Sequence, residues 1–241
     1  MTKKILIANW KMQLDPKASV GLAKQLSKLA VLKGEIVICP DFVSLSEVGK
    51  AIKGKLILGA QNLSANIKGA YTGQVAAASL KELGAKYVII GHSETRQYLG
   101  ETDELLRQKL IMALQFGLKP VLCVGEKKGE KAEAVLERQL SILKGLKITA
   151  KSGLVIAYEP VWAIGSGRAL SVKSANELQA IIKFIVKGYT TIVPPVIYGG
   201  SVDEKNVKDF MAEPYIDGLL VGGASLRAQS FNKIANIIFV K

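Results

Sequence analysis

The sequence predicts a single closed barrel of eight parallel strands and eight helices, a (β/α)₈ fold, on two main observations. First, a short apolar, β-branched run, a polar loop and a helix-period stretch recur eight times along the 241 residues. Second, the runs are mostly apolar rather than alternating, which is typical of strands buried on both faces of a parallel sheet. Eight such units in about this length match the (β/α)₈ count. No linker or change of composition divides the chain, so we expect one domain over 1–241.

The predicted elements follow one another in strict alternation. The strand-like runs are 4–9, 35–39, 55–60, 86–91, 119–124, 154–159, 195–199 and 218–221. They are rich in Val, Ile and Leu, and glycine, proline or polar residues end them. The helical candidates are 16–31, 44–52, 77–84, 102–117, 130–145, 173–187, 203–212 and 226–238. Their apolar residues recur with the helical period, which is typical of a helix with one face on a core.

One connection departs from this alternation. Residues 62–75 form a long segment with two glycines and no helical period. Loops of this length in compact domains are usually functional or contact a partner. The aromatic side chain of Tyr71 favours a partner contact over a flexible insertion.

The composition indicates a globular, intracellular chain. Hydrophobic residues make up 49% of the sequence, and the mean hydropathy is +0.25, so a sizeable core is expected rather than disorder. The longest apolar stretches fall far short of the ~20 residues of a membrane span, and the apolar run at 5–8 is too short for a signal peptide. Cys39 and Cys123 show no CxxC spacing, so we expect reduced core thiols in a cytoplasmic protein. With a single histidine, these residues do not suit a structural metal site.

The net charge is unusual for such a chain. A formal charge of +13 and a pI near 9.6 are typical of proteins that bind nucleic acid or an acidic membrane surface. The lysines are dispersed, however, and acidic residues interrupt the densest group, at 126–131. There is no basic arm and no zinc-finger spacing. We therefore expect a lysine-rich, solvated surface with no nucleic-acid or membrane partner; a nucleic-acid role is the alternative, which co-elution at low salt would reveal.

Polar groups fall at the C-terminal ends of the predicted strands, where (β/α)₈ enzymes carry their active sites. These residues are Asn9, Lys11, His92, Glu126 and Glu159. A lone histidine is more often a packed or surface residue. His92, however, directly follows the fourth strand and stands at a predicted helix start. Glu159 would be unfavourable inside an apolar strand unless it emerged at the rim, where Pro160 ends the strand.

Two glycine pairs follow the last two strands, at 199–200 and 222–223. One such pair is a weak signal because turns need glycine. Two pairs at these positions are a stronger signal. Unhindered backbone N–H groups can approach a phosphate there, and the loops after the seventh and eighth strands commonly form a phosphate site.

Five blocks of the sequence resemble the signature blocks of the triosephosphate isomerase family, in the same order. They are ANWKM (8–12), GHSE (91–94), AYEPVWAIG (157–165), YGGSV (198–202) and DGLLVGGASL (217–226). The third block is long and specific, and the resemblance covers nearly the whole chain. It implies an isomerase of dihydroxyacetone phosphate and D-glyceraldehyde 3-phosphate, active in glycolysis and gluconeogenesis without metal or organic cofactor.

The resemblance also assigns roles to residues. Glu159 would be the base and His92 the electrophile, while Lys11 would assist at the developing oxyanion. Asn9 and Lys11 would contact substrate, and Glu94 would hold Lys11 in place. The phosphate would be held by backbone N–H groups of Gly165, Ser201, Gly222 and Gly223. Residues 160–169 would form a closing lid, and Glu126 would support the site.

These roles are chemically reasonable. Isomerising a hydroxyketone to a hydroxyaldehyde moves a proton between adjacent carbons through an enediolate, which one carboxylate within reach of both carbons can do. The developing oxyanion needs a hydrogen-bond donor, which His92 and Lys11 would supply. In the family the histidine is neutral at a helix N-terminus, and closure of the lid excludes water.

Several positions depart from the family pattern. Ser166, Arg168 and Val172 stand where Thr, Lys and Pro are more frequent, which affects the expected kinetics of the lid. Gln74 and Thr95 stand where the family usually has Glu and Arg, an ion pair between the subunits of a dimer. Replacing both charges together can be nearly neutral for stability. We expect a homodimer through 62–75 with a neutral contact at Tyr71, Thr72, Gln74 and Thr95; independent drift at two tolerant positions is the alternative.

Two other functions on the same barrel stay open at this point. A non-catalytic phosphate-binding barrel would be expected to lack Glu159, His92 or Lys11, and all three are present. A different sugar-phosphate isomerase is the closer rival, and the AYEPVWAIG block argues against it.

Overall fold

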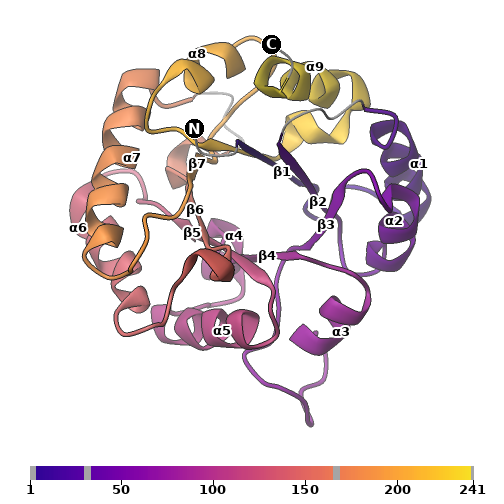
Figure 1. The fold of residues 1–241 in the computed structure, drawn as a ribbon, viewed down its shortest axis with the longest axis horizontal. Helices are drawn as coiled ribbons and strands as arrows, with labels where there is room; N and C mark the ends of the chain where they lie inside the picture. The colour runs from indigo at the N-terminus through magenta and orange to yellow at the C-terminus, as the bar shows by residue number, and fades with distance from the viewer. Residues whose placement is uncertain (1–3, 30–33, 165–168, 240–241) are drawn as a thin grey trace.

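A computed structural model describes residues 4–29, 34–164 and 169–239. Its eight strands form one closed barrel in chain order, and every neighbouring pair is parallel. Figure 1 looks along the barrel and shows the strands around the centre with the helices as an outer ring. The (β/α)₈ prediction is confirmed.

The strands lie where the apolar runs predict them. They are β1 (Ile5–Asn9), β2 (Glu35–Cys39), β3 (Ile57–Ala60), β4 (Tyr87–Ile90), β5 (Lys119–Val124), β6 (Val155–Tyr158), β7 (Val196–Tyr198) and β8 (Gly218–Val221). The helices are α1 (Pro16–Leu26), α2 (Leu45–Ile52), α3 (Ala77–Glu82), α4 (Ser93–Tyr98), α5 (Asp103–Gln115), α6 (Ala132–Leu140), α7 (Val172–Lys187), α8 (Val207–Ala212) and α9 (Ala228–Phe239). Of these, only α4 has no counterpart among the helices predicted from the sequence. Within the described ranges, no helix is both long and apolar enough to cross a membrane.

Two apolar clusters explain why the strands are apolar on both faces. Successive side chains of a strand point to opposite faces of the sheet. One alternate set, including Ile7 of β1 and Ile89 of β4, forms a cluster made up of strand residues. The other set, including Leu6 of β1, packs in a larger cluster that also contains helix residues such as Leu22 and Leu110. Both faces of the barrel wall are therefore dry, as a parallel barrel requires.

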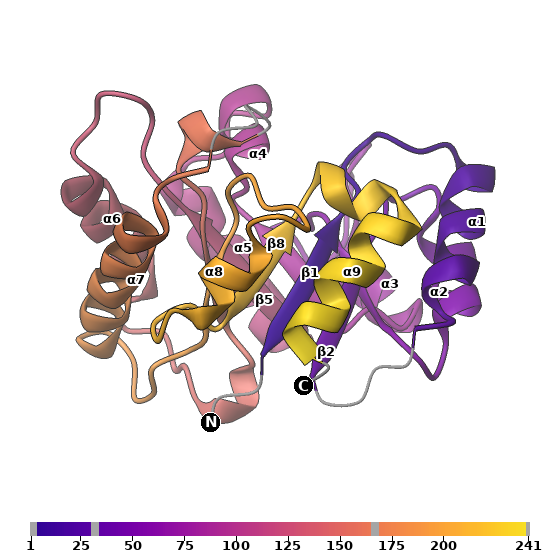
Figure 2. The same ribbon diagram turned by 90° about the horizontal axis from the view of Figure 1, so that it is seen from above.

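The parallel strands place their C-terminal ends at one end of the barrel. Figure 2 shows the arrowheads of β1 and β8 pointing toward the end at which α4 lies. The start of β1 and the end of α9 lie toward the opposite end. Residues that follow the strands therefore gather at one mouth, as the fold predicts.

The connection 62–75 contains no helix or strand. Its base is closed by the hydrogen bond from Ser64 N to Val75 O (2.8 Å), and a turn brings Gln74 N to Tyr71 O (3.0 Å). Figure 1 shows this segment beside α3, projecting beyond the ring of helices.

Candidate active site

A cavity of about 280 Å³ opens at the C-terminal mouth of the barrel. Most of the residues predicted to act on substrate line it together: Asn9, Lys11, His92, Glu159, Ser201, Gly222 and Gly223. Gly165, the remaining predicted phosphate residue, lies outside the described residues. Arg227 also lines the cavity, although the sequence analysis did not single it out. Its only sequence signal is its place directly after the last signature block.

Glu159 emerges from the wall directly after β6. Its backbone N–H donates to Val124 O of β5 (2.8 Å), so the sheet pairing continues up to this residue. The side chain is buried, and its Oε1 lies 3.3 Å from His92 Nε2. A Cβ at Gly199 would lie 2.7 Å from Glu159 Cγ, so glycine is needed there to make room for the carboxylate.

The second carboxylate oxygen of Glu159 is unusual. Oε2 is buried, yet no hydrogen bond reaches it within the described part of the chain. Buried polar atoms are nearly always hydrogen-bonded, and exceptions often have a functional reason. An unengaged carboxylate oxygen beside a cavity can accept a proton from a carbon acid.

His92 is the N-cap residue of α4. The backbone N–H of Glu94 donates to Nδ1 of His92 (3.2 Å). A nitrogen that accepts a hydrogen bond carries no hydrogen, so the neutral imidazole has its hydrogen on Nε2. Nε2 is the ring nitrogen that lies next to Glu159, so His92 presents a neutral N–H donor at the site.

Lys11 adopts a left-handed backbone conformation, with φ of 54°, which is unusual for a residue with a side chain. Three contacts hold it there. Its N–H donates to Asn9 Oδ1 (3.1 Å), its carbonyl accepts from Gln61 Nε2 (2.8 Å), and its Nζ pairs with Glu94 Oε1 (2.6 Å). Such conformations cost about 1–3 kcal/mol and are concentrated at functional sites. Gln61 could not be predicted from the sequence, because nothing in its local pattern shows that it reaches the end of β1.

The glycine-rich side of the cavity follows β7 and β8. Ser201 Oγ donates to Ala163 O (2.7 Å), which ties the loop after β7 to the segment after β6. Among the described residues, the adjacent ones left out, no heavy atom lies within 4 Å of the position that a Cβ of Gly223 would take, and a Cβ of Gly222 would be close only to Lys11 Cε (3.6 Å). The backbone at both glycines is thus open to a ligand in the cavity.

Comparison with known proteins gives the family. The family model described as triosephosphate isomerase matches residues 4–238. The chain belongs to the triosephosphate isomerase family. It is 45% identical to the triosephosphate isomerase of Thermoanaerobacter pseudethanolicus over 98% of this chain and 100% of that protein. It is 43% identical to the triosephosphate isomerase of Synechocystis sp. (98% and 99% covered) and 44% identical to that of Dictyoglomus turgidum (96% and 98% covered). The chain is a triose-phosphate isomerase, which interconverts dihydroxyacetone phosphate and D-glyceraldehyde 3-phosphate.

Two hydrogen-bonded tyrosines flank the segment expected to act as the lid of this isomerase. At its start, Glu126 accepts hydrogen bonds from Trp162 Nε1 (3.1 Å) and Tyr158 Oη (3.2 Å). At its end, Leu170 N donates to Tyr198 Oη (3.1 Å), and burial raises the pKa of Tyr198 to about 12. Burial and the Glu126 carboxylate likewise raise the pKa of Tyr158. Glu126 is not among the described residues that line the cavity. The departures at Ser166 and Arg168 lie outside the described residues.

The residues expected at a subunit contact of this triose-phosphate isomerase lie on the projecting connection and on α4. Tyr71, Thr72 and Gln74 are exposed. Gln74 Oε1 accepts a hydrogen bond from Ser64 Oγ within the same connection. Thr95 Oγ1 donates to Glu101 Oε2 (2.7 Å). Both neutral residues thus have hydrogen-bond partners within their own chain.

Proposed function

We propose that Glu159 is the base of this isomerase, and that it moves a proton between C1 and C2 of the triose phosphate. The observation that carries the proposal is the buried Glu159 carboxylate, with Oε1 3.3 Å from His92 Nε2 and Oε2 free of hydrogen bonds within the described residues. Glu159 takes a proton from the carbon next to the carbonyl, and the electron pair moves onto the carbonyl oxygen. The enediolate then takes a proton from Glu159 at the neighbouring carbon, and the hydroxyl proton of the first carbon moves to the other oxygen, so that the carbonyl group ends on the first carbon.

His92 and Lys11 stabilise the enediolate. The Nε2–H of His92 is a neutral donor whose position is fixed by the Glu94 N–H at Nδ1. The Lys11 ammonium, held by Glu94, adds a positive charge where the negative charge develops. One such donor is typically worth ~10²–10³ in rate. Asn9 contributes by fixing the backbone of Lys11 and by its own place in the cavity.

The phosphate group binds on the glycine-rich side, through backbone N–H groups at Ser201, Gly222 and Gly223. The open backbone at the two glycines supports this placement. Gly165 completes the set by resemblance to the family. This separation of the phosphate contacts from Glu159 means that binding and proton transfer can be altered independently.

The proton-transfer step is tested by running the isomerisation of dihydroxyacetone phosphate in D₂O and observing the product by NMR. A proton held by Glu159 exchanges with solvent, so D-glyceraldehyde 3-phosphate should carry deuterium at C2. Product without deuterium at C2, together with a Glu159→Gln variant that keeps its activity, would indicate direct hydride transfer between the carbons and would contradict the role of Glu159.

We infer that the chain forms a homodimer through the projecting connection. Exposed apolar side chains support the inference: Tyr71 lies on the connection, and Phe42 and Leu99 line a cavity beside it. A second cavity of about 280 Å³ lies between the connection and Leu99 of the loop after α4, and a partner could fill it. Contiguous exposed apolar surface usually marks an interaction site.

The remaining expectations follow from the family and the composition. We infer one domain over 1–241, because all eight strands of the described part belong to one barrel. We also infer a cytoplasmic enzyme of glycolysis and gluconeogenesis. The free thiols of Cys39 and Cys123, both buried, support a reducing compartment.

A further inference from the structure

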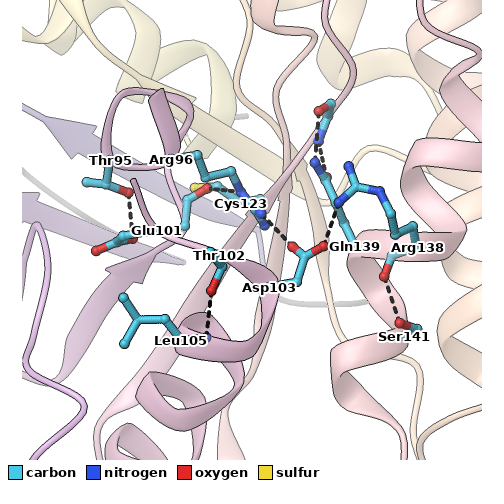
Figure 3. A network of polar contacts seen from close by, with 12 residues as sticks. Thr95, Arg96, Glu101, Thr102, Asp103, Leu105, Cys123, Arg138, Gln139 and Ser141 are labelled. Atoms are coloured by element: carbon cyan, nitrogen blue, oxygen red, sulfur yellow. Dashed lines mark hydrogen bonds and ion pairs between the residues drawn. The ribbon is translucent and has the colours of Figure 1, made fainter. Parts of the chain in front are cut away.

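A network of charged side chains lies behind the proposed catalytic pair, between α4, α5 and the ends of β4 and β5 (Figure 3). Its centre is Arg96 of α4. The Arg96 guanidinium donates from Nε to Gly91 O (2.8 Å) and from Nη2 to Cys123 O (3.3 Å). Gly91 directly follows β4, and Cys123 lies near the end of β5. One side chain therefore joins the two strand ends.

Asp103, the first residue of α5, holds Arg96 in this position. Its Oδ1 accepts from Arg96 Nη1 (2.6 Å), so the guanidinium is bonded on one side to the carboxylate and on the other to the two carbonyls. The Arg96 side chain is 17% exposed, and the planar guanidinium fork is well suited to bridging fixed acceptors. The other oxygen, Oδ2, accepts from Arg138 Nη1 (2.6 Å), whose side chain is 60% exposed.

Both strand ends that Arg96 joins lead directly to the proposed catalytic residues. On the β4 side, Gly91 is bonded to His92 through one peptide. On the β5 side, Val124 follows Cys123, and its carbonyl accepts the N–H of Glu159 (2.8 Å).

The chain beyond β5 is also packed tightly against Glu159. A Cβ at Gly125 would lie 1.9 Å from Glu159 O. Gln139 of α6 bonds both the N–H (2.8 Å) and the carbonyl (3.2 Å) of Gly125. A shift at the end of β5 is therefore expected to displace Glu159, because the backbone at Gly125 lies directly against the Glu159 backbone.

We propose that Arg96, held by Asp103, is a positioning residue for the isomerisation: it fixes the spacing between His92 and Glu159 without touching substrate. Neither Arg96 nor Asp103 lines the cavity at the barrel mouth. The inference rests on the proposed roles of His92 and Glu159, since the geometry it protects is the 3.3 Å approach of their side chains.

The test is the variant Asp103→Asn, which keeps the size of the side chain and removes its charge. We expect kcat to fall about ten- to hundredfold with little change in KM, because a misplacement near 1 Å costs about 10² in rate. The matched control is Arg138→Gln. It removes a bond to the same carboxylate on the solvent side, where Arg138 holds no strand end, and it should leave kcat unchanged.

A second readout separates positioning from general stability. His92 is the only histidine of the chain, so a protein labelled with ¹⁵N-histidine reports the imidazole of His92 alone. Asp103→Asn should shift the imidazole signals and Arg138→Gln should not. Arg96→Lys, which keeps the charge but loses the fork, should also lower kcat and provides the test if Asp103→Asn does not fold. Asp103→Glu should restore part of the loss.

If Asp103→Asn and Arg96→Lys unfold at lower temperature but keep wild-type kcat and His92 signals, the network is structural only, and the inference is wrong. That outcome differs from failure of the proposed function, in which a Glu159→Gln variant would keep its activity.

Discussion

At the scale of single residues, the buried polar side chains fall into two kinds. Glu101 and Lys109 are buried and paired, and Glu101 also accepts from Asn62 Nδ2 (2.8 Å) and Thr95 Oγ1 (2.7 Å). Glu159, in contrast, has one buried oxygen that no described residue satisfies. Full satisfaction indicates a structural role, whereas the unsatisfied oxygen agrees with the proposed role of Glu159 as the base.

The pairing of Glu101 makes a prediction for acid stability. Burial acts to raise its pKa, but the hydrogen bonds from Lys109, Asn62 and Thr95 and the charge of Lys109 outweigh burial, so the pKa of Glu101 is lowered. A lowered pKa in the folded state stabilises the fold above the unfolded value of about 4.3, and this stabilisation is lost as pH falls through the folded pKa.

Chemical denaturation of Glu101→Gln across a pH series measures this effect. At neutral pH the variant should be less stable by about 3–5 kcal/mol, because Lys109 is left as an unpaired buried charge. Below about pH 4 the difference in unfolding free energy between wild type and variant should become smaller, because protonation of Glu101 also removes its negative charge. The exposed Glu104→Gln is the control and should show little difference at any pH. A gap that stays constant with pH would contradict the lowered pKa.

At the scale of the elements, the strands could be predicted closely and the helices less so. The run 119–124 coincides with β5, because a buried parallel strand is a continuous apolar segment. Helix ends depend on contacts that the pattern does not contain. The predicted helix 203–212 begins only at Val207, because Asp203 Oδ1 accepts the N–H groups of Lys205 (2.8 Å) and Asn206 (3.3 Å) and holds a turn there.

Only some residues of the candidate site could be predicted from the sequence. Residues at strand ends, such as His92 and Glu159, could be found because the fold alone brings those ends together. Gln61 and the pair Arg96–Asp103 could not, because their contacts with Lys11 and Gly91 depend on side-chain direction. For α4, only the start at His92 was predicted and not the extent, since its six residues are too few for a periodic pattern.

The projecting connection carries a prediction about assembly. Gln74→Glu alone and Thr95→Arg alone should each weaken the proposed dimer, because each introduces one unpaired charge at the contact. The double variant should recover much of the loss by forming an ion pair. Sedimentation equilibrium of the four proteins gives the dissociation constants for a double-mutant cycle. Simple additivity of the two changes, or a fully active monomer, would contradict a paired contact between Gln74 and Thr95.

At the scale of the whole molecule, the net charge of +13 should act on the substrate before it binds. The substrate is a phosphate dianion, and a positive protein attracts it over distances comparable with the Debye length, about 10 Å at 0.1 M salt. The value of kcat/KM for dihydroxyacetone phosphate should therefore fall as salt rises at constant viscosity. Glyceraldehyde, which lacks the phosphate, is the control and should show little salt dependence. A flat response for both substrates would show that the charge does not contribute to capture.

We propose that Glu159 transfers the proton while other residues bind the phosphate group. Steady-state kinetics of Glu159→Gln, compared with His92→Gln, test it most directly. Loss of the base should lower kcat by about 10⁴ with KM little changed, since the phosphate contacts are intact. His92→Gln should cost less, about 10²–10³, because Lys11 still faces the oxyanion. A Glu159→Gln enzyme that kept more than about a few per cent of wild-type kcat would contradict the assignment of the base.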